Sequence, residues 1–134
     1  MKYLFKVLVP AAMLLFSSCE KDEGKLPSIS FKTGGTYISS DATVTGGTTI
    51  MMGIEASKSE DRDVLKKFNI SRSVNGGAET SLQDKSLSSS EEDKFSTDFN
   101  FTLDTTKGQT NKFIYTITNR DGLTNQVALT VTVK

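Results

Sequence analysis

The chain has 134 residues, with no histidine, no tryptophan and one cysteine, and this length fits one domain preceded by a short segment. Its 16 basic residues equal its 16 acidic residues, and the two kinds are mixed along the chain. This argues against a nucleic-acid partner, because phosphate binding needs clustered Lys and Arg.

The first 18 residues have the three parts of a secretory signal peptide. Lys2 and Lys6 come first, the apolar run 7–16 follows, and two serines precede Cys19. The apolar run is about half the ~20 residues that a transmembrane helix needs, so a permanent span is not expected. We therefore predict that residues 1–18 are a signal peptide that is removed on export.

The position of Cys19 accounts for the single cysteine of an exported chain. The segment 15–19, Leu-Phe-Ser-Ser-Cys, resembles the lipobox of bacterial lipoproteins, in which a signal peptidase cuts before a cysteine that carries diacylglycerol. Phe16 departs from the usual Leu, but relaxed boxes are familiar in the Bacteroidota-type lipoproteins that this leader resembles. The resemblance implies an outer-membrane lipoprotein in which acyl chains on Cys19 hold the protein on the membrane.

Residues 19–26 are predicted to be the lipidated cysteine and a charged tether. Lys21, Asp22 and Glu23 resemble the lysine and two acids that follow the cysteine in surface-exported members of this family, which implies display at the cell surface. The alternative interpretation is a solvated tether that carries no export signal. From Glu20 to Pro27 the tether reaches at most roughly 27 Å at ~3.3 Å per residue, so the domain is expected close to the membrane.

Residues 27–134 are predicted to form one all-β domain. Apolar and polar residues alternate in six windows, which is typical of strands with one buried face. No window of comparable length has helical spacing. The residues expected to face the core are Ile29 and Phe31; Ile50, Met52, Ile54 and Ala56; Phe68, Ile70 and Val74; Phe99, Phe101 and Leu103; Phe113, Tyr115 and Ile117; and Val127, Leu129, Val131 and Val133. Met51 is expected as an outward apolar residue on a central strand.

Turn-forming residues separate these windows, and Asn75-Gly76 is the strongest hairpin signal among them. About seven short strands, with turns every 8 to 12 residues or so, predict an immunoglobulin-like antiparallel sandwich. The pattern over residues 27–134 resembles bacterial immunoglobulin-like, PKD and cadherin-like modules, although the cysteine pair and tryptophan of antibody domains are absent. This resemblance concerns the fold and implies no activity.

An acidic loop before the third window contains Glu60, Asp61 and Asp63, and Asp121 is expected at the same end of the sandwich. Ca²⁺ takes six to eight oxygen ligands, and carboxylates one residue apart in a loop can point at one ion. The pair Asp61 and Asp63 resembles the Asp-x-Asp pair of cadherin-like modules. Basic neighbours neutralise the cluster and the Asn-Asp-Asn linker of those modules is missing, so a solvated loop is favoured over a calcium site. No other cofactor is expected.

A short motif in a predicted loop suggests a covalent modification. Asp104-Thr105-Thr106 resembles the sequon at which Bacteroidota-type bacteria O-glycosylate exported proteins. The resemblance implies a glycan on Thr105. Because motifs of this length also arise by chance, an unmodified loop is the favoured interpretation.

Two tyrosines could offer stacking faces to a sugar or a peptide. Tyr115 shares its face with Phe113 and Ile117, so we expect it in the core with its hydroxyl satisfied locally. For Tyr37 the sequence favours neither interpretation. The serine-rich, acidic run 86–93 has the spacing of a helix capping box, but no apolar run follows it, so we expect a loop rather than a helical turn.

Catalysis is not expected from this composition. Without histidine the chain has no Ser-His or Cys-His pair and no ordinary zinc site, and its acidic residues fall in predicted turns rather than in a cleft. We expect a non-catalytic, lipid-anchored envelope protein that recognises a glycan or a protein. The alternative is a structural spacer or accessory subunit of a larger envelope assembly. The sequence leaves the ligand and the oligomeric state open.

Overall fold

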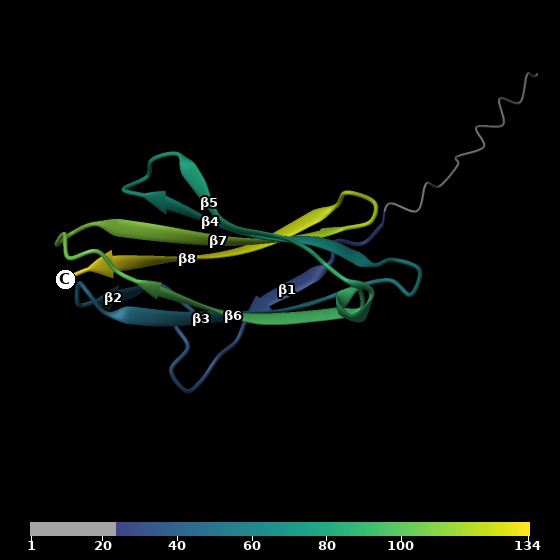
Figure 1. Ribbon diagram of the computed structural model, residues 1–134, viewed down its shortest axis with the longest axis horizontal. Coiled ribbons are helices and arrows are strands. Elements are labelled where there is room, and N and C mark those ends of the chain that lie inside the picture. Colours follow the sequence, from purple (N-terminus) through teal and green to yellow (C-terminus); the bar gives the residue numbers. More distant parts are fainter. Residues whose placement is uncertain (1–23) are drawn as a thin grey trace, which may run out of the picture.

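The computed structural model describes residues 24–134, which form two sheets packed face to face (Figure 1). One sheet has three strands in the order β1-β3-β6, and the other has five in the order β2-β8-β7-β4-β5. Neighbouring strands are antiparallel except β2 and β8, which are parallel. Two such sheets, with a first segment that changes sheets, form an immunoglobulin-like sandwich, so the predicted fold class is confirmed.

The described residues contain eight strands and one short 3₁₀ helix, η1. Their bounds are β1 Ser28–Phe31, β2 Ala42–Val44, β3 Thr49–Ser57, β4 Leu65–Val74, β5 Glu79–Ser86, η1 Ser89–Glu91, β6 Lys94–Thr102, β7 Thr110–Asn119 and β8 Thr124–Val133. Apolar alternation does not predict β2, which has three residues, or β5, whose single apolar residue is Leu82. Within residues 24–134, no helix is long and apolar enough to cross a bilayer.

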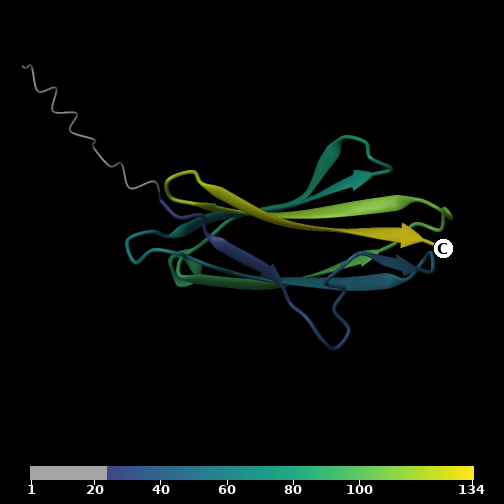
Figure 2. The same cartoon turned by 180° about the vertical axis from the view of Figure 1, so that it is seen from behind.

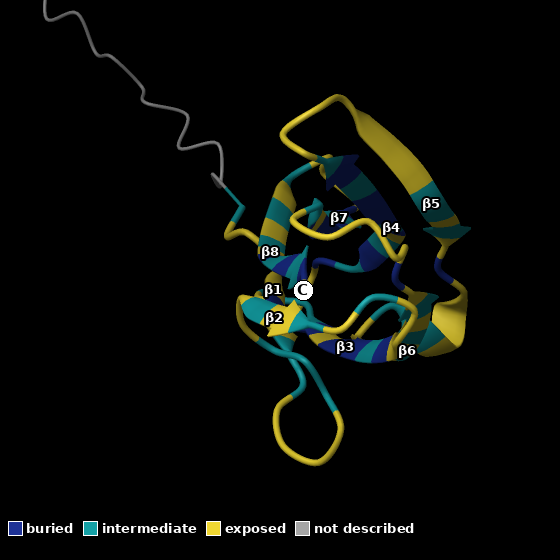
Figure 3. Ribbon diagram, turned by 90° about the vertical axis from the view of Figure 1, so that its left-hand side faces the viewer, coloured by how far each residue is buried: buried dark blue, intermediate teal, exposed yellow. Residues whose placement is uncertain are grey.

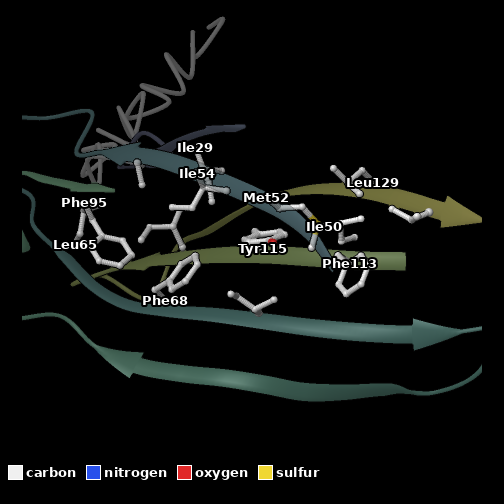
Figure 4. Close-up of a cluster of buried hydrophobic side chains, with 14 of the residues drawn as sticks. Ile29, Ile50, Met52, Ile54, Leu65, Phe68, Phe95, Phe113, Tyr115 and Leu129 are labelled. Atoms are coloured by element: carbon white, nitrogen blue, oxygen red, sulfur yellow. The ribbon is translucent and has the colours of Figure 1, made fainter. Parts of the chain in front are cut away.

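The core lies between the sheets and is built from the residues that alternate inward. Met52 of β3, Phe68 of β4, and Phe113 and Tyr115 of β7 are fully buried and are among the largest buried side chains. Figure 4 shows the side chains of β3 pointing toward those of β7. Burial of each such side chain contributes roughly 1.5–3 kcal/mol relative to exposure, so this layer fixes which face of every strand is left for solvent.

The chain changes sheets between β1 and β2. The loop at residues 33–36 projects away from the outer face of the three-stranded sheet and is exposed (Figures 2 and 3). Gly34 and Gly35 have positive φ values of 85° and 55°, which suit this tight reversal. The chain then returns beside β3, where Tyr37 bridges to Met51 and the Ile38 N–H donates to the Met51 carbonyl. Met51 is therefore half-buried rather than fully outward.

The sandwich has two ends with different loops (Figure 1). We call the end that carries residues 24–27, the β3–β4 loop 58–64, η1 and the β7–β8 turn 120–123 the N-terminal end. The C-terminal end carries Lys134, the β2–β3 turn 45–48, the β4–β5 turn 75–78 and the β6–β7 loop 103–109.

The expectation of a loop without a helical turn at residues 86–93 is wrong. Residues 89–91 form η1, and the Ser88 backbone N–H and hydroxyl both donate to Glu91 Oε1, at 3.1 and 2.9 Å. Lys85 Nζ lies 2.9 Å from Glu91 Oε2. The ammonium of Lys85 and the donors of Ser88 lower the pKa of Glu91 to about 2. One capped turn thus forms without the apolar run that a longer helix needs.

Candidate functional site

The outer face of the three-stranded sheet brings together side chains that lie far apart in the sequence. Alternate residues of β1, β3 and β6 point away from the core, and the strand register places them in rows. The row at the N-terminal end is Ser28, Ser57 and Lys94, and the next is Ser30, Glu55 and Ser96. The serines on these three adjacent strands are small, so the surface is recessed between the larger side chains around them.

These two rows line a groove of about 440 Å³. Its lining residues are Ser28, Ser30, Glu55, Ala56, Ser57, Lys94, Phe95 and Ser96. Each serine hydroxyl donates one hydrogen bond and accepts two, a carboxylate accepts, and an ammonium donates three. The groove therefore offers a dense set of donors and acceptors to a ligand.

A three-residue cluster occupies the next row of the same face. Asp98 of β6 accepts hydrogen bonds from Lys32 Nζ at 2.8 Å and from the Tyr37 hydroxyl at 2.9 Å. Lys32 Nζ also lies 5.7 Å from the centre of the Tyr37 ring. We call Lys32, Tyr37 and Asp98 the Asp98 cluster. It holds one aromatic ring at a defined place beside the groove.

Gly53 of β3 makes room for the Asp98 cluster. A β-carbon at Gly53 would lie 2.7 Å from Asp98 Oδ1, 2.8 Å from Lys32 Cδ and 2.8 Å from Tyr37 Cε1. Real β-carbons do not approach other atoms this closely. The absence of a side chain here lets the three residues close over the strand.

The protonation of the cluster follows from its contacts. The hydrogen bond from Lys32, and after it the one from Tyr37, lowers the pKa of Asp98. The hydrogen bond to Asp98 in turn raises the pKa of Lys32 and of Tyr37. At neutral pH the cluster is thus an anion held by one cation and one neutral phenol, and Tyr37 keeps its proton.

The acidic loop at the N-terminal end is built differently from the calcium site that the sequence raised as the less favoured alternative. Asp63 is 3% exposed, and its carboxylate accepts hydrogen bonds from the Asn119 side-chain amide and the Val64 N–H. Glu60 accepts a bond from the Lys25 N–H at 3.4 Å, and Asp61 is exposed. Asp63 thus serves the loop as an internal acceptor.

The turn that contains Asp121 does meet this loop. The Arg120 N–H donates to the Val64 carbonyl, and its guanidinium donates to the Arg62 carbonyl at 2.6 Å. Within residues 24–134, however, no three acidic or cysteine side chains gather in a group that could hold a metal ion. The calcium hypothesis for Glu60, Asp61, Asp63 and Asp121 therefore gains no geometric support.

The other predicted site residues have different locations. Cys19, Lys21, Asp22 and Glu23 lie outside the described residues. Thr105 is exposed in the β6–β7 loop at the C-terminal end.

The loop around Thr105 is held in place by its neighbours. The Arg72 guanidinium donates to the Asp104 carboxylate at 3.3 Å and to Asn111 Oδ1 at 2.6 Å. The same guanidinium lies 4.6 Å from the centre of the Phe101 ring. A β-carbon at Gly46 would lie 2.8 Å from Thr105 Cα, so the β2–β3 turn packs directly against this loop. Thr105 therefore lies on a loop that contacts with neighbouring residues hold in place, and its side chain is exposed to solvent.

Tyr115 is confirmed as a core residue, but its hydroxyl is not satisfied locally as expected. The ring is fully buried, and the hydroxyl has no hydrogen-bond partner among the described residues. Burial raises the pKa of Tyr115. Tyr115 is buried because it shares the inward face of its strand with Phe113 and Ile117. Whether its hydroxyl finds a hydrogen-bond partner depends on which residues lie opposite it in the core.

The groove and the Asp98 cluster are not found by reading the sequence alone. The S-x-S spacing of Ser28 and Ser30, on either side of core residue Ile29, is the available signal, because it places both hydroxyls on the outer face of one strand. This spacing gives no information on strand order, so it does not predict that β6 lies two strands away from β1 in the same sheet.

Comparisons with known proteins bear on the fold. No family model matches the chain, and no curated protein matches it at a significant level. Two solved structures of superoxide reductase (neelaredoxin) from Ignicoccus hospitalis are similar. The first has a TM-score of 0.54 at 11% identity over 87% of this chain and 86% of that chain. The second has a TM-score of 0.51 at 10% identity over 89% of each chain.

A CARDB domain from Pyrococcus furiosus has a TM-score of 0.46 at 12% identity over 82% of this chain and 99% of that one. At such identities the likeness to the two superoxide reductase structures shows a shared β-sandwich fold alone.

Proposed function

We propose that this chain is a non-catalytic, lipid-anchored envelope protein that recognises a glycan through the outer face of its three-stranded sheet. The observation that carries the proposal is the groove of about 440 Å³, lined by four serines, Glu55 and Lys94, beside the Asp98 cluster. Its volume falls within the roughly 300–1,000 Å³ of small-molecule sites.

The chemistry of the groove fits a polyhydroxylated ligand. Sugar hydroxyls both donate and accept, and the serine hydroxyls, the Glu55 carboxylate and the Lys94 ammonium supply both functions within two adjacent rows. Tyr37 of the Asp98 cluster adds an amphipathic aromatic ring with a fixed hydroxyl, the kind of side chain that contacts both the apolar and the polar parts of a ligand.

The same surface fits a protein partner less well. Within residues 24–134, Leu26 is the one large hydrophobic side chain that is exposed, and it lies outside the groove. The buried centres of protein interfaces are built from apolar and aromatic anchors. Apart from the Tyr37 ring, the groove and the Asp98 cluster present serines and charged groups and no exposed anchor of this kind, so of the two ligand classes expected from the sequence we favour the glycan.

Binding without cleavage is the mode that the groove supports. Glycoside hydrolysis uses two carboxyl groups on either side of the scissile bond. Glu55 is the single carboxylate among the residues that line the groove, and Asp98 on the next row is held by Lys32 and Tyr37. The groove thus lacks the pair of acids with different environments that this reaction requires.

The cellular placement belongs to the same proposal. It comprises a signal peptide over residues 1–18, a lipidated Cys19, a charged segment to residue 26, a sandwich from residue 27 onward, and outer-membrane display directed by Lys21, Asp22 and Glu23. Its support is the resemblance of the leader to bacterial lipoproteins. Membrane fractionation of wild type and Cys19→Ala tests it: we expect the variant to be released, and its retention would contradict the anchor.

A second candidate function is an accessory subunit of a larger envelope assembly. Within residues 24–134, β6 pairs with β3 alone, so its other edge presents unpaired backbone groups over nine residues. Such an edge can add a strand from a partner. Lys94 and Asp98 place charges along it, which is a common protection against this pairing, so we rank this function second.

A glycan array tests the proposed function. The probe is the chain from Glu20 to Lys134, as wild type, Ser30→Trp and Ala128→Trp. Ser30 is exposed in the groove, so a Trp there fills it, whereas Ala128 is exposed on the other sheet and serves as the matched control. We expect wild type and Ala128→Trp to bind the same glycans and Ser30→Trp to lose them. Absence of any bound glycan, or equal binding by all three, would overturn the proposal.

A further inference from the structure

The segment that enters the sandwich is fixed to the N-terminal end from Gly24 onward. The Ser59 hydroxyl donates to the Leu26 carbonyl at 2.6 Å, and the Asn125 side-chain amide donates to the Pro27 carbonyl at 2.9 Å. Pro27 itself is buried. Ser59 follows β3 and Asn125 belongs to β8, so the entering chain is tied to both sheets.

Two further contacts extend this attachment toward the predicted anchor. The Lys25 N–H donates to Glu60 Oε1 at 3.4 Å. A β-carbon at Gly24 would lie 3.2 Å from Leu123 Cδ1 and 3.4 Å from Asp121 Oδ2, so this glycine packs against the β7–β8 turn. The predicted tether is thus part of the folded unit over its last residues, and four residues, 20–23, separate Cys19 from it.

Chain length then limits how the sandwich can stand on a membrane. The Cα atoms of Cys19 and Gly24 are five residues apart and can be separated by at most roughly 18 Å at ~3.6 Å per residue. Strand β7 alone has ten residues, or roughly 33 Å at ~3.3 Å per residue, between the two ends of the sandwich. An orientation with the C-terminal end on the membrane would require the short segment to cover the longer distance.

We propose that the N-terminal end of the sandwich rests on the lipid surface, with Leu26 among the headgroups and the C-terminal end pointing away. This inference rests on the proposed lipid anchor at Cys19. Leu26 is 53% exposed and is the one exposed large hydrophobic among the described residues, and it lies at the end that the anchor holds near the bilayer. An apolar side chain at this position is stabilised when it is buried in the headgroup region of the membrane.

The charge of this end allows close approach to a membrane. Residues 24–27, 58–63 and 120–123 contain four basic and four acidic residues. The segment that carries η1 adds Glu91, Glu92 and Asp93, which form ion pairs with Lys85, Lys66 and Lys58, so this end carries little net charge. An anionic lipid surface therefore exerts little net repulsion on this end. At physiological ionic strength, salt screens the remaining repulsion beyond ~8 Å. The groove then opens sideways in the half of the sandwich nearer the lipid, since Ser28, Ser57 and Lys94 form its row at the N-terminal end.

Fluorescence quenching on vesicles tests this orientation. The full chain is expressed, processed and reconstituted into vesicles of phosphatidylcholine and phosphatidylglycerol that contain a lipid with a nitroxide-labelled headgroup. Cys19 is the single native cysteine, so once it is lipidated an introduced thiol is the one labelling site. Three variants carry a fluorophore at exposed positions: Asp61→Cys at the N-terminal end, Lys107→Cys at the C-terminal end and Ala128→Cys on the flank.

We expect quenching to fall in the order Asp61, Ala128, Lys107. Equal quenching at Asp61 and Lys107, or quenching at the flank as strong as at Asp61, would overturn the orientation. Adding Ser59→Ala and Asn125→Ala, which removes the two side chains that hold the entering segment, should reduce the difference between the labels.

Vesicle flotation and intact mass distinguish the two ways in which this inference can fail. A chain that lacks acyl chains and does not float overturns the anchor and the orientation with it. A chain that is lipidated and floats, but shows equal quenching, overturns the orientation alone. The glycan array with Ser30→Trp remains an independent test of the groove in either case.

Discussion

Asp63 accepts a hydrogen bond from the side-chain amide of Asn119, and both residues are almost fully buried, at 3% and 2% exposed. The pair joins the β3–β4 loop to the end of β7. Asn119 Oδ1 also accepts the Leu123 N–H at 2.9 Å, and Asp63 Oδ1 accepts the Val64 N–H at 2.8 Å. Two buried polar side chains thus organise the end of the sandwich at which the chain enters.

Replacing Asp63 by Ala should destabilise the domain. The change leaves the buried amide of Asn119 and the Val64 N–H without their acceptor, and an unsatisfied buried polar group costs about 1–3 kcal/mol. Urea unfolding gives the free energy of unfolding. Asp61→Ala is the control, since Asp61 is exposed in the same loop and its loss should change stability by no more than about 0.5 kcal/mol. Equal effects of the two variants would contradict the structural role of Asp63.

The same two variants also test the calcium hypothesis. If the loop bound Ca²⁺, millimolar ion would raise the Tm of the wild type, and Asp61→Ala would abolish the rise without changing the Tm measured in chelator. We expect no Ca²⁺-dependent shift in either protein, because the Asp63 carboxylate is already taken up by Asn119 and Val64. A heat of binding in calorimetry would contradict this expectation.

The pH dependence of stability should carry the signature of Glu91. Its pKa is lowered from 4.5 to about 2 in the folded protein by Lys85 and Ser88. A lowered folded-state pKa adds stability that is complete above the unfolded-state value and is lost as pH falls through the folded-state value. The stability difference between wild type and Glu91→Gln should therefore be full above pH 4.5 and shrink toward pH 2.

Urea unfolding of both proteins across this pH range measures the effect of Glu91. Asp61→Asn, which neutralises an exposed carboxylate outside η1, is the control for the change in net charge. A difference between wild type and Glu91→Gln that stays constant down to pH 2 would show that the contacts of Glu91 do not control its protonation.

Removing the hydroxyl of Tyr115 should not weaken the core. The hydroxyl is buried without a partner among the described residues, so Tyr115→Phe removes a desolvated polar group and keeps the ring. We expect a free energy of unfolding that is unchanged or raised by about 1 kcal/mol. Tyr115→Ala is the contrast and should cost about 3–5 kcal/mol, as large core truncations do. A clear loss in Tyr115→Phe would reveal a hydrogen-bond partner for the oxygen.

Gly53→Ala should open the Asp98 cluster without unfolding the domain, because the atoms that a β-carbon would meet all belong to side chains. Loss of the hydrogen bond to Asp98 should lower the raised pKa of Tyr37 toward 10. An absorbance titration of the phenols detects this, since a chain that starts at Glu20 has two tyrosines, Tyr37 and Tyr115. Asp98→Asn should also lower the pKa of Tyr37. An unchanged titration in both variants would contradict the cluster.

The sequence predicts the fold well because the core requires alternation. Where a strand buries one face, as β3 does with Ile50, Met52 and Ile54, apolar residues must recur at every second position, and this alternation predicts six of the eight strands in residues 24–134. β5 is an edge strand that buries little, so its sequence carries no such pattern.

The candidate site is harder to predict because it depends on which strands are neighbours. Lys32 and Asp98 are separated by 66 residues, and they meet only through the order β1-β3-β6. Alternation tells which residues face outward but gives no information on strand order. In the acidic loop, composition favours solvated carboxylates, whereas Asp63 turns inward to the amide of Asn119, which the distant end of β7 supplies.

Backbone NMR of the chain from Glu20 to Lys134, titrated with the strongest glycan from the array, tests the central claim most directly. The proposal predicts that the largest chemical-shift changes lie on the outer face of the three-stranded sheet, at Ser30, Gly53, Glu55 and Ser96. Largest changes in the turns 45–48 and 75–78 or the loop 103–109 at the C-terminal end, or no changes at all, would contradict recognition through this face.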